Sequence, residues 1–290
     1  MKIATYRMGG ERRVGVIDDN KQTVSPFDIP AEDAAHGVLA LIDRADLPRV
    51  LSAMPLREAD IEAPIVRPRR NIFCVGKNYH DHAKEFASSG FDSSAANGVV
   101  PKHPIIFSKV PECVVAHGAP IDIDGAVSQA VDYEAELGVI IGKGGRGIKP
   151  ENALDHVWGY TIINDVTARD LQGRYSQWLI GKSQDTFCPM GPWAVTRNEI
   201  DLSDTKIRCW INGDLRQNAN TRDLIFDIPT IIATISAGVS LIPGDIIASG
   251  TPSGVGIGFK PPKYVVAGDV ARIEIAGIGM LQNEFREIRS

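Results

Sequence analysis

The sequence predicts a mixed α+β fold that is rich in strands and poor in helices, preceded by a small N-terminal α+β module. Of its 290 residues, 28 are glycine and 18 are proline, which indicates many turns between short elements. Short apolar segments that end at glycine, proline or an Asn-Gly pair recur along the chain, as strands joined by turns do. A basic, proline-containing segment at 63–70 predicts the boundary between the module, residues 1–63, and a larger domain, residues 64–290.

Composition and charge limit the classes of protein to which the chain can belong. A hydrophobic content of 43% and a charged content of 23% are ordinary for a globular domain. The net charge of −5 argues against nucleic acid or an anionic membrane as the main partner. The N-terminal residues lack the apolar core of a signal peptide, and no apolar run is long enough to span a bilayer. Four scattered cysteines without a Cys-x-x-Cys pair favour free thiols in a reducing cytoplasm.

The N-terminal module begins with a predicted hairpin. Residues 3–8 and 13–18 have strand character, and Gly9-Gly10 between them is typical of a tight turn. Residues 37–42 and 47–54 then have helical spacing of apolar side chains. No reactive groups are paired here, so the module is interpreted as a scaffold or a dimer contact.

The larger domain contains a series of apolar segments bounded by turn residues. Each predicted helix in it follows a residue that can cap its first turn, Asn78 or Asp227. The predicted helices are 78–86 and 228–236, and the predicted strands are 71–76, 104–109, 131–141, 158–165, 192–196, 206–211, 245–248 and 269–275.

The segment 131–141 is the centre of the functional argument. As a strand it would place its apolar residues on one face and Asp132, Glu134 and Glu136 on the other. Glu134 and Glu136 would lie roughly 7 Å apart along the strand, and oxygen ligands at that spacing suit Mg²⁺ or Mn²⁺ better than zinc. The competing interpretation is a solvated strand face with acidic residues. Asp165, at the end of strand 158–165, is well placed to be a third ligand.

A possible proton-transfer pair lies on the predicted helix 78–86. His82 and Glu85 are three residues apart and share one helix face, so the carboxylate can orient the imidazole as a general base. A solvated helix face of mixed charge remains the alternative.

Two glycine-rich segments have features of phosphate or nucleotide sites. Residues 142–147 match Gly-x-Gly-x-x-Gly after a strand, which is the dinucleotide-binding context. The acidic residues in the preceding strand and Pro150 before the helical segment argue against it and favour a turn. Residues 249–256 lack the lysine of a triphosphate-binding loop, although their backbone amides could hold a carboxylate.

Taken together and in order, the motifs resemble the fumarylacetoacetate hydrolase family, and in particular its acylpyruvase-like and oxaloacetate-decarboxylase-like branch. The motifs are Val75–Glu85, Asp132–Leu137, Asn164–Gln172, Gly181–Ser183 and Gly250–Gly256, and the likeness extends over about residues 70–276. The resemblance implies a β-roll of packed mixed sheets, usually in a homodimer.

The resemblance also implies roles for individual residues. The implied metal ligands, for one Mg²⁺ or Mn²⁺ per chain, are Glu134, Glu136 and Asp165. The implied water-activating pair is His82 and Glu85, and the implied pocket residues are Arg169, Gln172, Lys182 and, against the substrate carboxylate, Thr251.

These residues lead to a hypothesis of function with several rivals. The leading hypothesis is metal-dependent hydrolysis of a C–C bond in an acylpyruvate-type 1,3-diketo acid, with aromatic-catabolic diketo acids in the range of substrates. The His82–Glu85 pair would activate water, and the metal with Lys182 would hold the charge of the departing pyruvate enolate. Decarboxylation of oxaloacetate or a related oxo acid, and isomerisation of a 2-hydroxydienoate, are alternatives on the same metal site. A nicotinamide-dependent oxidoreductase and a non-catalytic metal-binding protein are the rivals from other classes.

Overall fold

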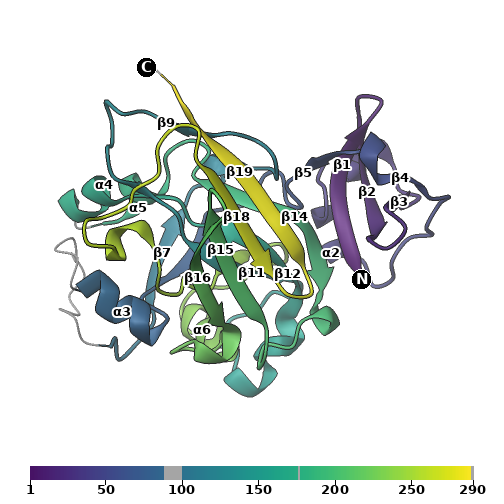
Figure 1. Ribbon diagram of the computed structural model, residues 1–290. Coiled ribbons are helices and arrows are strands. Elements are labelled where there is room, and N and C mark those ends of the chain that lie inside the picture. Colours follow the sequence, from purple (N-terminus) through teal and green to yellow (C-terminus); the bar gives the residue numbers. More distant parts are fainter. Residues whose placement is uncertain (88–99, 176, 289–290) are drawn as a thin grey trace.

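The protein is built on a large curved sheet against which a smaller sheet packs (Figure 1). The computed structural model describes residues 1–87, 100–175 and 177–288. The larger sheet has the order β4-β3-β2-β1-β14-β12-β11-β17-β6-β7, with β5 beside β1 and β8 beside β14. Its strands are β1 (Lys2–Met8), β2 (Glu11–Asp18), β3 (Thr23–Pro26), β4 (Met54–Pro55), β5 (Asp60–Glu62), β6 (Ile72–Gly76), β7 (Ile105–Lys109), β8 (Val114–Val115), β11 (Ala135–Ile141), β12 (Val157–Asn164), β14 (Cys188–Thr196) and β17 (Ile246–Ala248).

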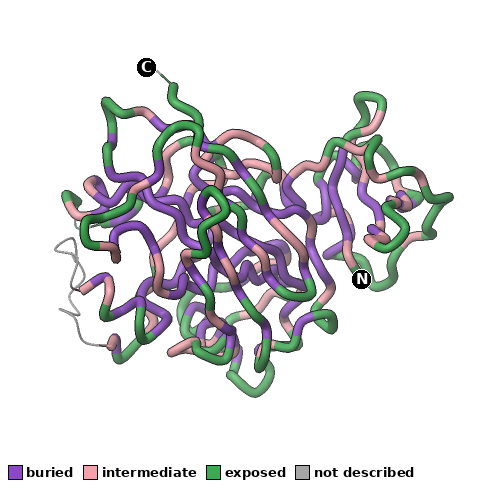
Figure 2. The backbone as a smooth tube through the Cα atoms, in the orientation of Figure 1, coloured by how far each residue is buried: buried purple, intermediate pink, exposed green. Residues whose placement is uncertain are grey.

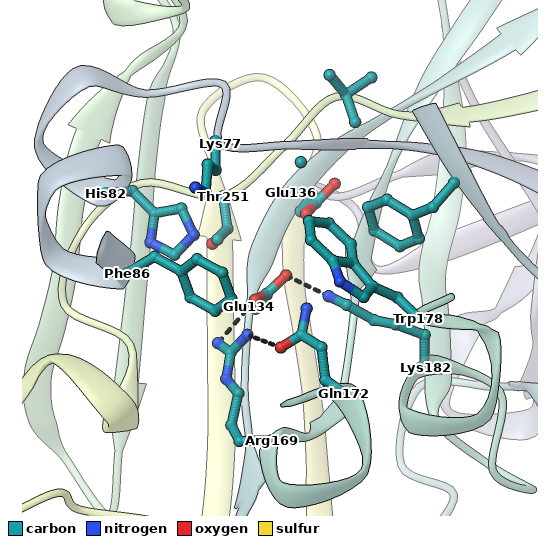
Figure 3. Close-up of a pocket in the computed structure, with 13 residues that line it drawn as sticks. Lys77, His82, Phe86, Glu134, Glu136, Arg169, Gln172, Trp178, Lys182 and Thr251 are labelled. Carbon is teal, nitrogen blue, oxygen red and sulfur yellow. Dashed lines mark hydrogen bonds and ion pairs between the residues drawn. The ribbon is translucent and has the colours of Figure 1, made fainter. Parts of the chain in front are cut away.

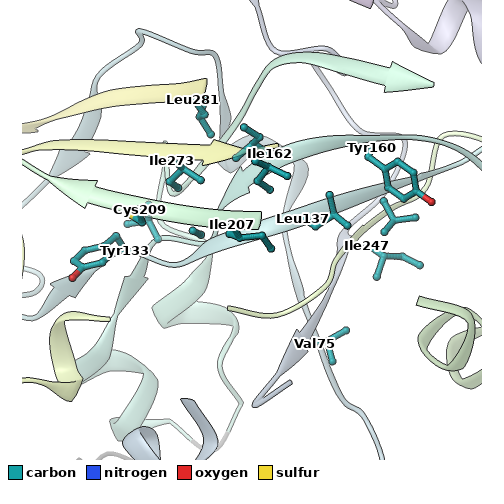
Figure 4. Packing of buried hydrophobic residues seen from close by; sticks show 14 of the residues in the cluster. Val75, Tyr133, Leu137, Tyr160, Ile162, Ile207, Cys209, Ile247, Ile273 and Leu281 are labelled. Atoms are coloured by element: carbon teal, nitrogen blue, oxygen red, sulfur yellow. The ribbon is translucent and has the colours of Figure 1, made fainter. Parts of the chain in front are cut away.

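The smaller sheet covers one face of the larger one and closes the main core. Its order is β16-β15-β18-β19-β9, and a separate pair, β10 and β13, lies near the site described below. Their bounds are β9 (Ile121–Ile123), β15 (Lys206–Ile211), β16 (Asp214–Asn220), β18 (Val270–Ile275), β19 (Gly279–Glu287), β10 (Val131–Asp132) and β13 (Thr167–Ala168). Figure 4 shows Leu137 and Ile162 of the larger sheet packed with Ile207 and Ile273 of the smaller one. Burial of such aliphatic side chains is the main stabilising term of a fold of this kind.

The helices of the described residues are short, and they connect strands or cover the ends of the sheets. The α-helices are α1 (Ala31–Ala34), α2 (Leu39–Ile42), α3 (His80–Ala87), α4 (Arg169–Arg174), α5 (Leu179–Lys182) and α6 (Ile228–Ser236). The 3₁₀ turns are η1 (Leu56–Glu58), η2 (Pro111–Cys113), η3 (Pro150–His156), η4 (Arg197–Glu199), η5 (Thr221–Asp223) and η6 (Gly256–Gly258). Among these, no helix is long and apolar enough to cross a membrane.

The N-terminal strands continue the larger sheet. Strand β1 pairs antiparallel with β14, with Lys2 opposite Val195 and Ile3 opposite Ala194. Figure 2 shows buried residues running through these strands while the connecting loops are exposed. The division into residues 1–63 and 64–290 remains a prediction.

Several sequence predictions agree with the structure in detail. The fold is the predicted mixed, strand-rich α+β class, and the N-terminal hairpin forms between β1 and β2. Helix α6 spans the predicted residues, and the Asp227 carboxylate accepts a hydrogen bond from the backbone N–H of Thr230, which caps its first turn. All four cysteines are buried with free thiols.

Other local predictions are wrong, each for a tertiary reason. The helix predicted at 47–54 does not form, because Val24 pairs with Met54 and Phe27 with Val50 at the edge of the sheet. Helix α3 begins at His80 rather than after Asn78. The Asn78 side chain instead bonds to the backbone of Phe226 and Ser249.

The predicted strand 131–141 is interrupted. It divides into β10 and β11, with Tyr133 and Glu134 outside both strands. The glycine segment 142–147 is a turn, as expected, with Gly145 bridged to Leu241.

Candidate active site

The site lies where the central strands of the larger sheet end. Strand β11 follows Glu134 directly and carries Glu136, and β12 ends at Asn164, next to Asp165. Ala135 pairs with Asn164 in the antiparallel register, and the backbone N–H of Asp165 donates to the carbonyl of Glu134. This register brings carboxylates that are about 30 residues apart in sequence to one end of the sheet.

The carboxylates of Glu134, Glu136 and Asp165 form a buried acidic triad. One oxygen from each lies within 4.8 Å of the others. All three side chains are at most 5% exposed, so water does little to screen their repulsion. An oxygen-only donor set of this kind fits a hard divalent cation such as Mg²⁺ or Mn²⁺. The three carboxylates that the sequence marked as candidate ligands thus lie together, and their binding of a cation stays a prediction.

The three carboxylates have unequal electrostatic surroundings. Burial favours the neutral form of Glu134, but Lys182 and Arg169 outweigh it and lower the pKa of that carboxyl to about 2. Burial raises the pKa of Glu136 well above its ordinary range, and the charges of Asp165 and Glu134 raise it further. A divalent cation would favour the ionised form of Glu136 and relieve this repulsion.

Buried lysines surround the triad. The ammonium of Lys182 donates to Glu134 Oε2 at 2.7 Å and to Asp165 Oδ2 at 2.8 Å. Lys109, at the end of β7, donates to Asp165 Oδ1 at 2.8 Å and to the carbonyl of Lys182. Burial lowers the pKa of Lys109, but the charge of Asp165 opposes it and the net direction is upward. Lys109 thus holds both a triad carboxylate and the backbone of a pocket lysine, a role that the sequence did not indicate.

Arg169 is fixed by two acidic side chains from outside its helix and by an amide group within helix α4. Its Nε donates to Asp132 Oδ2 at 2.9 Å, its Nη1 donates to Gln172 Oε1 at 3.1 Å, and its Nη2 lies 2.7 Å from Glu134 Oε1. Asp132 also accepts the backbone N–H groups of Gly256 and Ile257. Asp132 therefore anchors both Arg169 and the loop after β17.

The His82–Glu85 pair forms as predicted and is held against the same loop. His82 Nδ1 lies 3.2 Å from Glu85 Oε2, and Glu85 Oε1 accepts the backbone N–H of Gly254 at 3.0 Å. A Cβ at Gly258 would lie 1.8 Å from Glu85 Oε1, so only glycine allows this approach. Because an ionised carboxylate only accepts hydrogen bonds, Nδ1 carries the proton in this pair and Nε2 is left as the basic nitrogen.

These groups border one small pocket. In Figure 3, His82, Lys77 and Thr251 lie on one side, Trp178 and Lys182 on the other, and the two glutamates between them. The lining residues that the sequence had singled out are His82, Glu134, Glu136, Arg169, Gln172, Lys182 and Thr251. Asp165 and Glu85 lie directly behind this lining, bonded to Lys182 and His82.

The pocket also contains groups that sequence reasoning missed. Phe86, Phe107 and Trp178 form apolar walls, with the Trp178 ring edge-on to both phenylalanines. Lys77 is 3% exposed and has a left-handed backbone conformation, φ +53°, that is unusual for a residue other than glycine. Its position directly after a strand that ends in glycine was the available signal. The aromatic residues gave none, since they resemble ordinary core positions.

Comparison with known proteins places this chain in a family of enzymes. Residues 71–286 match the profile described as fumarylacetoacetate (FAA) hydrolase C-terminal. Oxaloacetate tautomerase YisK of Bacillus subtilis is 49% identical over 230 residues, which cover 79% of this chain and 74% of that protein. The chain therefore belongs to the fumarylacetoacetate hydrolase family.

Solved structures agree with the family assignment over the whole chain. The fumarylacetoacetate hydrolase of Exiguobacterium antarcticum is 40% identical, with a TM-score of 0.85 and coverage of 99% of this chain and 100% of that chain. A maleylpyruvate hydrolase from Sphingobium sp. SYK-6, solved with manganese(II) and pyruvate, is 30% identical, with a TM-score of 0.78 and full coverage of both chains.

Proposed function

We propose that this enzyme interconverts the enol and keto forms of oxaloacetate or a closely similar 2-oxo dicarboxylic acid. The observation that carries the proposal is the enclosure of His82. Its side chain is only 5% exposed, it is oriented by Glu85, and it borders a small pocket with apolar walls. Such a site suits proton transfer within a bound ligand, because bulk water is kept from the reacting atoms. The similarity to a protein named oxaloacetate tautomerase supports the same substrate.

The chemistry requires one proton to move between two atoms of the ligand. In the enol, C2 carries a hydroxyl and is double-bonded to C3. We propose that His82 Nε2 takes the hydroxyl proton, while Glu85 stabilises the imidazolium through Nδ1. The C2–O bond then becomes the carbonyl, and Nε2 returns a proton to C3. Atoms and charge balance without water, and the positive side chains of Lys182 and Arg169 offset charge on the ligand.

We propose that Glu134, Glu136 and Asp165 hold one Mg²⁺ or Mn²⁺. The buried donor set supports it, as does the manganese in the structure of the related maleylpyruvate hydrolase. When bound, the cation would act as a Lewis acid that polarises a 2-oxo acid and orients it. Homodimerisation, which the family resemblance implies, stays a prediction that light scattering would check.

Hydrolysis of an acylpyruvate, the leading hypothesis from the sequence, is the second candidate. The observation in its favour is the same His82–Glu85 pair, which could deprotonate water if a water molecule entered beside the ligand. Decarboxylation and dienoate isomerisation would use the same cation site and need no attacking water.

One set of assays separates these reactions. With Mg²⁺ present, we expect the protein to accelerate the loss of the ultraviolet absorbance of enol-oxaloacetate over buffer, without releasing pyruvate. Pyruvate released from oxaloacetate would identify a decarboxylase. Pyruvate released from acetylpyruvate, with no effect on enol-oxaloacetate, would overturn the tautomerase proposal in favour of the hydrolase.

Lys77 provides a test of the dicarboxylic acid. Its ammonium lies 5.4 Å from the centre of the Phe86 ring, and the Arg169 guanidinium lies 5.8 Å from the same ring. The pocket thus has a buried cation on the side opposite Lys182, as Figure 3 shows. We expect Lys77→Met to raise the KM for oxaloacetate about 10- to 100-fold, the range for a hydrogen bond to a charged group. The inhibition constant of oxalate, which lacks the C4 carboxylate of oxaloacetate, should change less than threefold.

A neighbouring lysine supplies the control. Lys84 is on the exposed face of helix α3, 71% exposed and paired with Asp81. Lys84→Met should leave both constants unchanged. An equal loss of oxaloacetate and oxalate affinity in Lys77→Met would mean that Lys77 does not bind the second carboxylate of oxaloacetate.

A further inference from the structure

Gln217 joins the smaller sheet to the candidate site. It lies in β16 and is fully buried, although it does not border the pocket. Its side chain bonds to the backbone of Ala135, between the two glutamates of the triad, and to Thr251 and Pro252 in the loop after β17. One amide therefore connects a metal-ligand strand with the loop that carries a pocket hydroxyl.

The partners of Gln217 fix which way each hydrogen bond runs. The backbone N–H of Ala135 can only donate, so the atom 3.0 Å from it is the carbonyl oxygen of Gln217. The amide nitrogen then faces the carbonyl of Pro252, which can only accept, at 2.8 Å, and Thr251 Oγ1, also at 2.8 Å. Both hydrogens of the amide are used, and Thr251 Oγ1 must accept one of them.

This direction determines what Thr251 offers to a ligand. A hydroxyl that accepts a hydrogen bond from Gln217 keeps its own hydrogen for another partner. Thr251 lines the pocket and is 2% exposed, so bulk water does not compete strongly for that hydrogen. We infer that Gln217 is a positioning residue that makes the Thr251 hydroxyl a donor toward the ligand, so that the site selects an ionised carboxylate or oxo oxygen at that point. The inference rests on the proposed function for the identity of the ligand as a 2-oxo acid.

Replacement by glutamate reverses the direction of the hydrogen bond. In Gln217→Glu the new carboxylate can still accept from Ala135, but it can only accept from Thr251, which must then turn its hydrogen away from the pocket. We expect the dissociation constant of oxalate, measured by calorimetry on the Mg²⁺-loaded protein, to rise about 10- to 100-fold. The KM for oxaloacetate should rise similarly, with kcat changed less than threefold.

Two further variants separate positioning from structural support. Gln217→Met leaves Thr251 free to donate, so oxalate affinity should fall less than in Gln217→Glu, although the unpaired N–H of Ala135 lowers the Tm. In a Thr251→Val background the glutamate substitution should change oxalate affinity less than twofold, because the hydroxyl through which it acts is gone.

Each contrary outcome is informative. If Gln217→Glu weakened oxalate binding as much in the Thr251→Val background as in wild type, Gln217 would not act through the Thr251 hydroxyl. An equal loss of oxalate affinity in Gln217→Met and Gln217→Glu would lead to the same conclusion. Oxalate binding that follows the expected pattern, without turnover of oxaloacetate by the wild type, would overturn the proposed function but not the role of Gln217. Absence of oxalate binding to wild type with Mg²⁺ would count against both.

Discussion

Replacing Glu136 with glutamine is expected to abolish turnover while leaving the metal-free protein at least as stable as wild type. Glu136 accepts a hydrogen bond from the backbone N–H of Gly250 and lies beside the carboxylates of Asp165 and Glu134, which repel its charge. A glutamine keeps the shape and the bond to Gly250 but removes that repulsion. It also removes one charged ligand of the proposed cation, so activity should fall by roughly 10²- to 10³-fold or more.

The measurement compares melting temperatures with EDTA and with Mg²⁺. For wild type, Mg²⁺ at about 100 times its Kd adds ~2.7 kcal/mol, a rise of roughly 4–5 °C in a protein of this size. Glu136→Gln should lose most of that rise while its Tm in EDTA equals or exceeds that of wild type. Glu134→Gln is the matched contrast. It leaves Arg169 and Lys182 short of a partner, so its Tm in EDTA should fall. Full activity of Glu136→Gln, or of wild type after exhaustive removal of metal, would refute the cation site.

Replacing His82 with alanine should reduce kcat by roughly 10²- to 10⁴-fold, the usual contribution of a general acid–base group. The effect on metal-dependent stabilisation should be small, because His82 is not part of the acidic triad. Glu85→Gln should reduce kcat less, since the imidazole remains but loses the carboxylate that orients it.

His80 provides a control for the His82→Ala variant. It begins the same helix and is exposed, and a change there leaves the pocket lining intact. His80→Ala should retain wild-type kcat within threefold. If His82→Ala retained it as well, neither the tautomerase nor the hydrolase mechanism through this pair could stand.

Local sequence patterns were sufficient to predict the helix on which His82 and Glu85 meet, because three-residue spacing is a property of the helix itself. Strand alternation pointed to Glu134 and Glu136, and the end of a predicted strand pointed to Asp165. The resemblance to a family supplied the remaining pocket residues, and the structure brings the whole set together around one pocket. The catalytic and binding roles of those residues remain predictions.

The parts that were missed depend on contacts between distant segments. Asp132 was expected beside Glu134, but its bonds to Arg169 and Gly256 span 37 and 124 positions in sequence. Lys109 was recognised as the end of a strand, but its contact with Asp165 spans 56 positions in sequence. Gln217 lies in the smaller sheet, and the alternation of side chains along β16 does not predict that its amide contacts Thr251.

The loop after β17 positions three carboxylates of the site through its backbone. Within a few residues, its backbone N–H groups bond to Glu136 from Gly250, to Glu85 from Gly254 and to Asp132 from Gly256. A carboxylate proposed to bind the cation, the one that orients His82 and the one that anchors Arg169 are therefore aligned to the same stretch of main chain. Main-chain amides cannot be altered by ordinary side-chain substitution. Changes in ligand preference can therefore accumulate around the pocket without disturbing the mutual alignment of these three functions.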